Sequence, residues 1–488
     1  MASLLHIATT LSLSSAFLFS SASAQQCSYS VLETSYPAPV VANNWSYSLV
    51  ANELRRPRGI FFDSEGALLV IDSGVGIIHL ELEDEGETCL QVSKKTTLLR
   101  KENLNHGIAL SRDGRTLYAS TSDEVFAWPY DPSDATLRNS SVQTLVANMT
   151  NGGHTSRTLL ISQRYPDMLL VSRGSDGNDD PEAENIDSGH SQLRAFNISA
   201  YSDGTDRKPY DYLDGVLLGW GLRNSVGVAE HPETGGIFSV ENSADQLRRN
   251  GVDIHSDNPG EEMNFHGYLN GSRDHQGGNY GYPLCYTLWS TDDFPDLGDL
   301  KTGDQFPADR QIDDGDATAL TDEECLSDHV APVLAFQAHT APLDLKFDRD
   351  GSRAYISFHG SWNRQDPVGY EISYAAFEDG QPAASSRSMN ATTSIIHNQA
   401  LSSCPDDCFR PVGLAWDSEG RLWFSSDSTG EIFVLSQSDR RRSGGGNETP
   451  ETGADEEGDD DSSAFSLRPA SAAALVTLAA VIMGGFLA

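Results

Sequence analysis

The chain contains six copies of one strand–turn–strand pattern, and this repeat constrains the fold more than any other feature of the sequence. In four copies, a small apolar strand is followed by a turn of acidic residues and glycine seven residues on. The polar residues that open the copies are Arg56-Pro57-Arg58-Gly59, Asn105-His106-Gly107, His154-Thr155-Ser156-Arg157, Arg223-Asn224-Ser225-Val226-Gly227, His339-Thr340-Ala341-Pro342 and Arg410-Pro411-Val412-Gly413. A repeat of this length predicts equivalent units arranged around an axis or stacked along one.

The copies begin near residues 59, 107, 158, 227, 344 and 413, and their short apolar runs are bounded by Asp, Gly and Ser, as is typical of strands. Six units of four strands predict an all-β protein, a six-bladed β-propeller over residues 25–437. The wide interval around residues 253–316 is rich in Gly, Asp and Asn, and we expect an elaborated loop region there, which could cover the axis. A β-sandwich is the alternative fold, but it would not explain the common phase of the copies.

Both ends of the chain differ from the repeat region. Residues 1–24 are an apolar, Ser-rich leader that ends in Ala22-Ser23-Ala24, which predicts a signal peptide. Residues 438–463 are an acidic, Gly/Ser-rich stalk, and residues 464–488 are hydrophobic, an order typical of a glycosylphosphatidylinositol (GPI) attachment signal. A single transmembrane helix is the alternative, although such a helix usually carries basic residues on one side. We therefore expect a secreted protein that is held at the cell surface by a lipid anchor.

Cysteines, sequons and charge agree with an extracellular setting. Six cysteines are an even number, and of the fifteen pairings we expect Cys404–Cys408, with Cys27–Cys89 and Cys285–Cys325. Seven Asn-x-Ser/Thr sequons predict a glycoprotein, at Asn44, Asn139, Asn148, Asn197, Asn270, Asn390 and Asn447. The net charge of −38 argues against a nucleic-acid partner, which would require clustered Lys and Arg.

The polar openings of the copies predict the binding site. Because the first strand of each propeller blade lies nearest the axis, we expect these openings to meet at one mouth of the channel. Arg58 (or Arg56), Arg223 and Arg410 would then surround a compact polyanion, since the guanidinium fork matches pairs of carboxylate or phosphate oxygens. His154 lies in a Gly-rich segment and has a side chain suited to proton abstraction.

Other polar segments carry weaker signals. Arg157 could be a further cationic contact or a tie between blades, and we expect the tie between blades. The polar bend Glu241–Asp245 could offer carbonyl oxygens to calcium, whereas Asp257–Glu262 reads as a solvated loop. The segment His359–Arg364 contains Trp362 and predicts a wall that stacks on a flat ligand.

These motifs together resemble the soluble glucose/sorbosone dehydrogenase family, six-bladed propellers that bind pyrroloquinoline quinone (PQQ), and within it the fungal pyranose dehydrogenases. The motifs that carry the resemblance are Gly153-His154 with Arg157, Gly221-Leu222-Arg223-Asn224, Glu241-Asn242-Ser243-Ala244-Asp245, Gly278-Asn279-Tyr280-Gly281-Tyr282-Pro283, His359-Gly360-Ser361-Trp362-Asn363-Arg364 and Phe409-Arg410-Pro411-Val412-Gly413. They span nearly all of residues 50–437. The resemblance implies an extracellular quinoprotein dehydrogenase that transfers hydride from a hydroxyl of a pyranose or aldos-2-ulose to PQQ, assisted by Ca²⁺.

The resemblance also implies a role for each matching residue. His154 resembles the general base, and Arg223 with Asn224 resembles the pair that holds and polarises the quinone oxygens. Backbone carbonyls of Ser243 and Ala244 match those that hold calcium. The residues that match cofactor contacts are His359 and Arg410 at the cofactor carboxylates, Arg58 as a less close match there, and Trp362 in the wall.

Two positions depart from the bacterial members of this family, which carry an acid where Gly153 stands and a lysine where His359 stands. The orientation of His154 must therefore come from another residue. Two alternative functions are a calcium-dependent propeller hydrolase of the lactonase kind and a non-catalytic carbohydrate-binding or adhesion propeller. The partners expected for the dehydrogenase are a small sugar and an electron acceptor, which could be a cytochrome, a quinone or a copper oxygenase.

Overall fold

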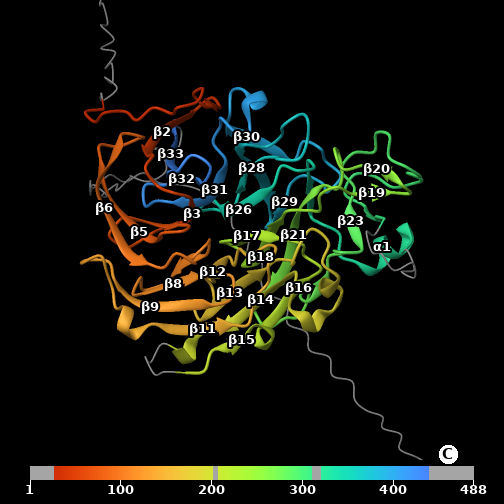
Figure 1. Ribbon diagram of the computed structural model, residues 1–488, viewed down its shortest axis with the longest axis horizontal. Helices are drawn as coiled ribbons and strands as arrows, with labels where there is room; N and C mark the ends of the chain where they lie inside the picture. Colours follow the sequence, from red (N-terminus) through yellow and green to blue (C-terminus); the bar gives the residue numbers. More distant parts are fainter. Residues whose placement is uncertain (1–26, 202–206, 310–319, 439–488) are drawn as a thin grey trace, which may run out of the picture. The chain divides into compact units, whose positions relative to one another are not determined.

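The computed structural model describes residues 27–201, 207–309 and 320–438, and these residues form a six-bladed β-propeller (Figure 1). The innermost strands of the blades, in chain order, are β3 (Pro57–Phe62), β7 (Ile108–Leu110), β12 (Leu159–Ile161), β17 (Ser225–Glu230), β26 (Pro342–Phe347) and β31 (Pro411–Trp416). All six lie at the predicted copies. The predicted fold and the phase of the repeat are therefore confirmed.

Each innermost strand starts an antiparallel meander of four strands. The second strands are β4 (Leu68–Asp72), β8 (Thr116–Ser120), β13 (Met168–Arg173), β18 (Gly236–Glu241), β27 (Arg353–Phe358) and β32 (Leu422–Ser426). The third strands are β5 (Gly76–Asp84), β9 (Val125–Asp131), β14 (Gln192–Asn197), β21 (Glu261–Tyr268), β28 (Glu371–Glu378) and β33 (Glu431–Gln437). The outermost strands are β6 (Leu90–Arg100), β11 (Gln143–Ala147), β16 (Val216–Trp220), β25 (Leu334–Phe336), β30 (Thr392–His397) and β2 (Trp45–Ala51).

Short elements complete the described part of the chain. The additional strands are β1 (Val40–Val41), β10 (Thr136–Leu137), β15 (Tyr210–Asp211), β19 (Arg248–Arg249), β20 (Val252–Asp253), β22 (Gly278–Asn279), β23 (Cys285–Thr287), β24 (Gln305–Pro307) and β29 (Gln381–Pro382). The helices are α1 (Asp322–Asp328) and the 3-10 turns η1 (Asn139–Ser141), η2 (Pro181–Glu184), η3 (Ile186–Ser188), η4 (Ser199–Tyr201), η5 (Tyr212–Asp214) and η6 (Leu401–Ser403). No helix among these described residues is long and apolar enough to cross a membrane.

The ring of blades is closed by strands from both ends of the described chain. Strand β2 pairs antiparallel with β33, so the sixth blade combines residues 45–51 with residues 411–437 (Figure 1). The innermost strands contact one another in order, and β31 contacts β3. Closure of this kind removes the free edge that an open row of blades would leave at each end.

In-phase glycines let the innermost strands approach one another. A Cβ atom at Gly59 would clash with the carbonyl oxygen of His106, and one at Gly413 would clash with that of Arg58. Hydroxyl groups on the second strands then bridge to the next blade: Ser425 donates to the Arg58 carbonyl at 2.6 Å. The repeated glycine in the sequence therefore reflects close packing around the axis.

The hydrophobic core lies between adjacent sheets. In β4, Leu68 and Val70 pack into the cluster shared with the sixth blade, whereas Leu69 and Ile71 pack into the cluster shared with the second blade. Successive side chains of a strand point to opposite faces, and here both faces are covered by neighbouring blades. Short, continuously apolar strands are the sequence signature of this arrangement.

The region predicted as a loop, residues 253–316, contains a blade strand, and that prediction was wrong. Strand β21 is the third strand of the fourth blade and pairs with β18 and β25. Its first residues, Glu261 and Glu262, are buried, so the interpretation of Asp257–Glu262 as a solvated loop was also wrong. These carboxylates concealed the strand because buried acids are rare outside paired or hydrogen-bonded sites.

Described residues on both sides of β21 in the sequence form a small subdomain at the right of Figure 1, with β19, β20, β23 and α1. Arg249 makes two contacts of 2.7 Å with Asp322, and the disulfide Cys285–Cys325 joins β23 to α1. The other predicted pairs, Cys27–Cys89 and Cys404–Cys408, also form disulfides, so all three pairings are confirmed. The predicted signal peptide and anchor signal, and the stalk beyond Ser438, lie outside the described residues.

Candidate functional site

Arg58 and His359 meet at one carboxylate at the mouth of the ring. Asp427, which follows β32, accepts from Arg58 Nη1 at 2.6 Å and contacts His359 Nε2 at 2.8 Å. Burial would raise the pKa of Asp427, but His359 and Arg58 hold it well below its usual range. Burial and the charges of Arg410 and Arg58 lower the pKa of His359 in spite of the neighbouring Asp427.

Arg410 is held beside this pair. Its guanidinium donates to the carbonyl of His359 at 3.1 Å and to the carbonyl of Gly360 at 2.6 Å, and it stands over the Tyr370 ring. Arg58, His359 and Arg410 come from the first, fifth and sixth blades and are more than 300 residues apart at the extremes of the sequence. The structure therefore brings together three of the predicted cofactor contacts. Arg56, the alternative to Arg58, is exposed.

His154 is held in one orientation by a serine. Its Nδ1 lies 2.8 Å from Ser175 Oγ, and that hydroxyl donates to the Gly177 carbonyl at 2.7 Å. Because the hydroxyl proton is used by Gly177, the serine oxygen accepts from Nδ1–H, which leaves Nε2 as the free basic nitrogen. Ser175 thus supplies the orientation that Gly153 cannot.

The electrostatic surroundings keep His154 neutral. Burial and the nearby Arg223 cation lower its pKa from 6.5 to about 3. The loop that carries it is fixed by Arg157, which is fully buried and donates to the carbonyl oxygens of His154 and Met149 at 2.8 and 2.7 Å. Arg157 is therefore a structural tie, as predicted, although it ties its own loop.

Arg223 is the most connected residue of the site. It donates to the Ser243 carbonyl at 2.6 Å and to Asn178 Oδ1 at 2.8 Å, and it lies 3.4 Å from Asp245 Oδ2. Its neighbour Asn224 has a partly exposed side chain whose amide makes no hydrogen bond to another described residue. Arg223 is thus saturated with protein acceptors, whereas Asn224 retains its full capacity to bind a ligand.

Buried acids support the bend that contains Ser243 and Ala244. Glu261 accepts from the backbone N–H of Ser243 at 2.6 Å and from that of Ala341 at 3.1 Å, and burial raises its pKa to about 7. Burial and the neighbouring Glu262 raise the pKa of Glu241 as well. The Glu261 carboxyl group therefore fixes the backbone of the bend at Ser243, while the Asn242 and Ser243 carbonyl oxygens accept from Arg223.

Asp245 links the two halves of the site. Burial would raise its pKa, but a hydrogen bond from His339 and the charge of Arg223 lower it. Asn363 donates to its Oδ1 at 2.5 Å, so the segment that begins at His359 is joined to the Arg223 side. Trp362, next to Asn363, is 64% exposed and is therefore available to a ligand without being enclosed.

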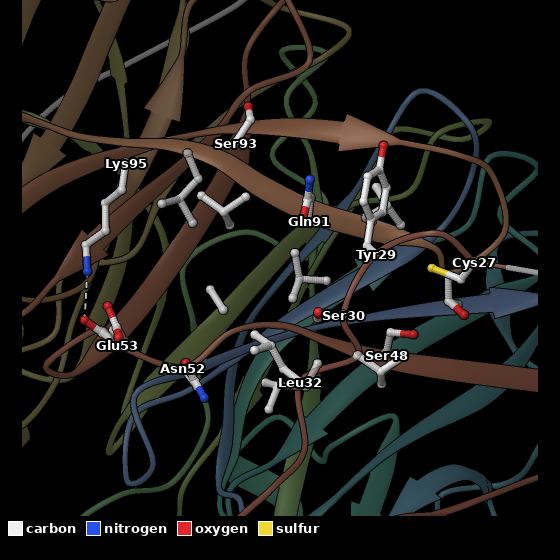
Figure 2. A pocket seen from close by; sticks show the side chains of 18 of the residues that line it. Cys27, Tyr29, Ser30, Leu32, Ser48, Asn52, Glu53, Gln91, Ser93 and Lys95 are labelled. Atoms are coloured by element: carbon white, nitrogen blue, oxygen red, sulfur yellow. Dashed lines mark hydrogen bonds between the residues drawn. The ribbon is translucent and has the colours of Figure 1, made fainter.

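Aliphatic side chains lie just beyond some of the polar openings. Val226, Leu343 and Val412, each on an innermost strand, pack together only a few residues beyond the polar openings of their blades. They form an apolar layer between the fourth, fifth and sixth blades next to the polar groups of the site. The cavity of about 420 Å³ in Figure 2 is elsewhere, between the segment after Cys27 and strands β2 and β6, and none of the predicted site residues line it.

Sequence reasoning missed Asp427, Ser175, His339 and Asn178. A signal for Asp427 exists, because the second strand of an antiparallel pair ends beside the start of the first. Pro411 lies opposite Ser426, and Ser225 lies opposite Glu241. Residues that follow second strands thus reach the same mouth as the openings of the copies. Ser175 carries the same signal, because it follows β13, the second strand of the third blade, whereas Asn178 lies farther along that loop.

Comparison with known proteins gives consistent matches across the propeller. The family model described as TrAA12-like matches residues 39–438. A pyrroloquinoline quinone-dependent sugar dehydrogenase of Hypocrea jecorina is 53% identical over 423 residues, which are 86% of this chain and 95% of the relative. A calcium structure of a Trichoderma reesei Carbohydrate-Active Enzymes Family AA12 protein is 54% identical with a TM-score of 0.80, covering 84% of this chain and 99% of that one. The holo form of the pyranose dehydrogenase PQQ domain from Coprinopsis cinerea is 35% identical with a TM-score of 0.75, covering 83% and 98%.

Proposed function

Since the chain belongs to the TrAA12-like family, we propose that it is a PQQ-dependent dehydrogenase that oxidises a hydroxyl group of a sugar, a pyranose or an aldos-2-ulose. The observation that carries this proposal is the convergence of an oriented, neutral His154 with Arg58, Arg223 and Arg410 at one mouth of the propeller. A base beside several cations suits a reaction in which a proton leaves the substrate while negative charge develops nearby.

The residues present fit an acidic quinone. Arg58 and Arg410 supply guanidinium donors for carboxylates, and Arg364 Nη1 is buried without a hydrogen-bond partner among the described residues. Asn224 offers an unused amide next to Arg223, where quinone oxygens would be held. When bound, PQQ would supply the two-electron acceptor for the hydride that leaves the sugar.

Calcium fits the bend at Ser243 and Ala244 under one condition. Both residues supply backbone carbonyl oxygens, the ligand type that Ca²⁺ prefers, and Glu261 places a carboxyl group behind them. However, the Ser243 carbonyl accepts from Arg223. A calcium ion that uses this oxygen must therefore displace the guanidinium, which would release Arg223 toward the quinone side of the site.

His154 would remove the substrate hydroxyl proton at Nε2. The Ser175 contact presents this nitrogen, and the low pKa keeps it unprotonated. The same low pKa, set first by burial and then by the Arg223 charge, makes the imidazole a weak base in the free protein. An anionic ligand beside Arg223 would offset that charge and raise the pKa of His154, so we expect cofactor binding to strengthen the base.

Reconstitution tests this function. The purified protein is loaded with PQQ and Ca²⁺ and assayed by dye reduction over a panel of pyranoses, aldos-2-uloses and lactones. Sugar-dependent reduction is expected, and His154→Ala should abolish it while PQQ affinity stays close to that of the wild type. Lactone hydrolysis without dye reduction would instead support the hydrolase, and a protein that binds sugar without either reaction would be a carbohydrate-binding propeller.

We further propose that the enzyme acts outside the cell and is held there by a GPI anchor. The supports are the sequence of the two ends, the three disulfides and the seven sequons. Release of the protein from intact cells by a phosphatidylinositol-specific phospholipase is the test. Protein that stays on the cells after that treatment, but is extracted by detergent, would indicate a membrane-spanning segment instead.

A further inference from the structure

One histidine among the polar openings of the blades was given no predicted role. His106 precedes β7 in the second blade, between the blades that supply Arg58 and His154. Its side chain is 4% exposed, and no described residue forms a hydrogen bond with either ring nitrogen; Nδ1 is buried and unpartnered. A buried polar group without a hydrogen-bond partner lowers the stability of the protein by its full desolvation penalty. The presence of an unpartnered imidazole among these cations therefore requires an explanation.

The position of His106 is fixed by its backbone. Gly59 of the first blade packs against the His106 carbonyl, and Asn105 donates to the Thr155 carbonyl of the third blade at 2.8 Å. The backbone of His106 is therefore held at a fixed place between the first and third blades. His106 is not a mobile surface residue.

Charged groups from three other blades act on the ring. These are Arg58 of the first blade, Lys346 of the fifth blade and Asp427 of the sixth blade. Arg58 directly precedes Gly59, which packs against the His106 carbonyl, so His106 lies next to the residue that forms the Arg58–Asp427 pair. Burial and the charges of Arg58 and Lys346 lower the pKa of His106, which keeps it neutral with one N–H to donate.

We propose that His106 is a further ligand of the acidic quinone cofactor, donating its unused N–H to an oxygen that Arg58 also binds. This inference rests on the proposed function. An anionic oxygen placed there would accept from the imidazole and would add a second acceptor for Arg58, which is already paired with Asp427. The protein without the cofactor would carry the cost of the unpartnered ring, so His106 would be retained for binding at the expense of stability.

The test measures two quantities on the full chain without cofactor: the Kd for PQQ at fixed Ca²⁺, by tryptophan fluorescence titration, and the melting temperature before PQQ is added. His106→Leu keeps the volume and removes the donor, whereas His106→Gln keeps a donor. His79→Leu is the control for loss of a buried imidazole, because His79 is 2% exposed and lies in β5 away from the openings, where its Nε2 is 3.6 Å from Asp63 Oδ2.

The expected result is a Kd at least about tenfold higher for His106→Leu, with an equal or higher melting temperature, since a hydrogen bond to a charged group is lost while an unpaired polar group is removed. His106→Gln should stay within about threefold of the wild type, and His79→Leu should not change the Kd. If His106→Leu binds PQQ as tightly as the wild type, or changes only the KM for the sugar, the inference is wrong while the proposed function stands. If the wild type binds no PQQ, the proposed function fails and this inference fails with it.

Discussion

Removal of the Asp427 charge is expected to weaken the hub of the propeller measurably. Asp427 has an 8% exposed side chain and makes contacts of 2.6 and 2.8 Å with Arg58 and His359, and the Arg58 side chain is itself only 14% exposed. Removing one partner of a buried ion pair leaves the other uncompensated and costs about 3–5 kcal/mol. The unfolding entropy of about 400 ordered residues is roughly 0.8 kcal/mol per degree, so Asp427→Asn should lower the melting temperature by about 4–6 °C.

Thermal unfolding followed by circular dichroism at pH 7 measures this change. Glu81→Gln is the control, because the Glu81–Lys94 pair is exposed, with side-chain exposures of 40% and 61%, and should move the melting temperature by about 1 °C or less. The difference also depends on pH. The folded pKa of Asp427 lies below its ordinary value of 3.8, so its stabilisation is present above pH 3.8 and is lost as pH falls below it. Equal melting temperatures of Asp427→Asn and the wild type at pH 7 would refute the reasoning.

Three further predictions concern the same site and the ring around it. The His154 imidazole should stay neutral in the free protein from pH 8 down to about pH 4, and an NMR titration showing a midpoint near 6.5 would contradict the effect assigned to burial and Arg223. Arg410→Ala should raise the Kd for PQQ about tenfold or more in a fluorescence titration, because it removes a charged donor, whereas unaltered affinity would exclude Arg410 from the carboxylate contacts. Gly59→Ala should lower the free energy of unfolding by about 1–3 kcal/mol in urea, because its methyl group meets the His106 carbonyl, and a variant as stable as the wild type would mean that the innermost strands can move apart.

The repeat made the propeller predictable because every blade satisfies the same packing requirement. Gly59, Gly107 and Gly413 each meet a backbone atom of the next blade, so the geometry leaves a periodic mark in the sequence. Strand β21 escaped prediction since its start is built from buried glutamates that support the Ser243 bend. At this position, carboxyl groups that support the Ser243 bend replace the apolar side chains by which strands are recognised in a sequence.

The residues of the site also divide into those that the repeat predicts and those that it does not. Arg58, Arg223 and Arg410 could be predicted because they share the phase of the copies, and phase translates into position around an axis. Ser175 follows a second strand, β13, so its place at the mouth could be predicted in the same way, but its contact of 2.8 Å with His154 could not, because that contact depends on the conformation of two loops. Periodicity gives placement around the ring, whereas the choice of a hydrogen-bond partner is set by loop conformation.

The pairing of β2 with β33 has a consequence for synthesis. Residues 45–51 leave the ribosome among the first of the propeller, yet their partner strand, residues 431–437, is made almost four hundred residues later. Until then the early strand has no sheet to join, and the nascent ring stays open with an apolar blade face exposed. Completion of the final sheet is therefore a late step with a long loop to close, during which a chaperone would have its longest opportunity to act.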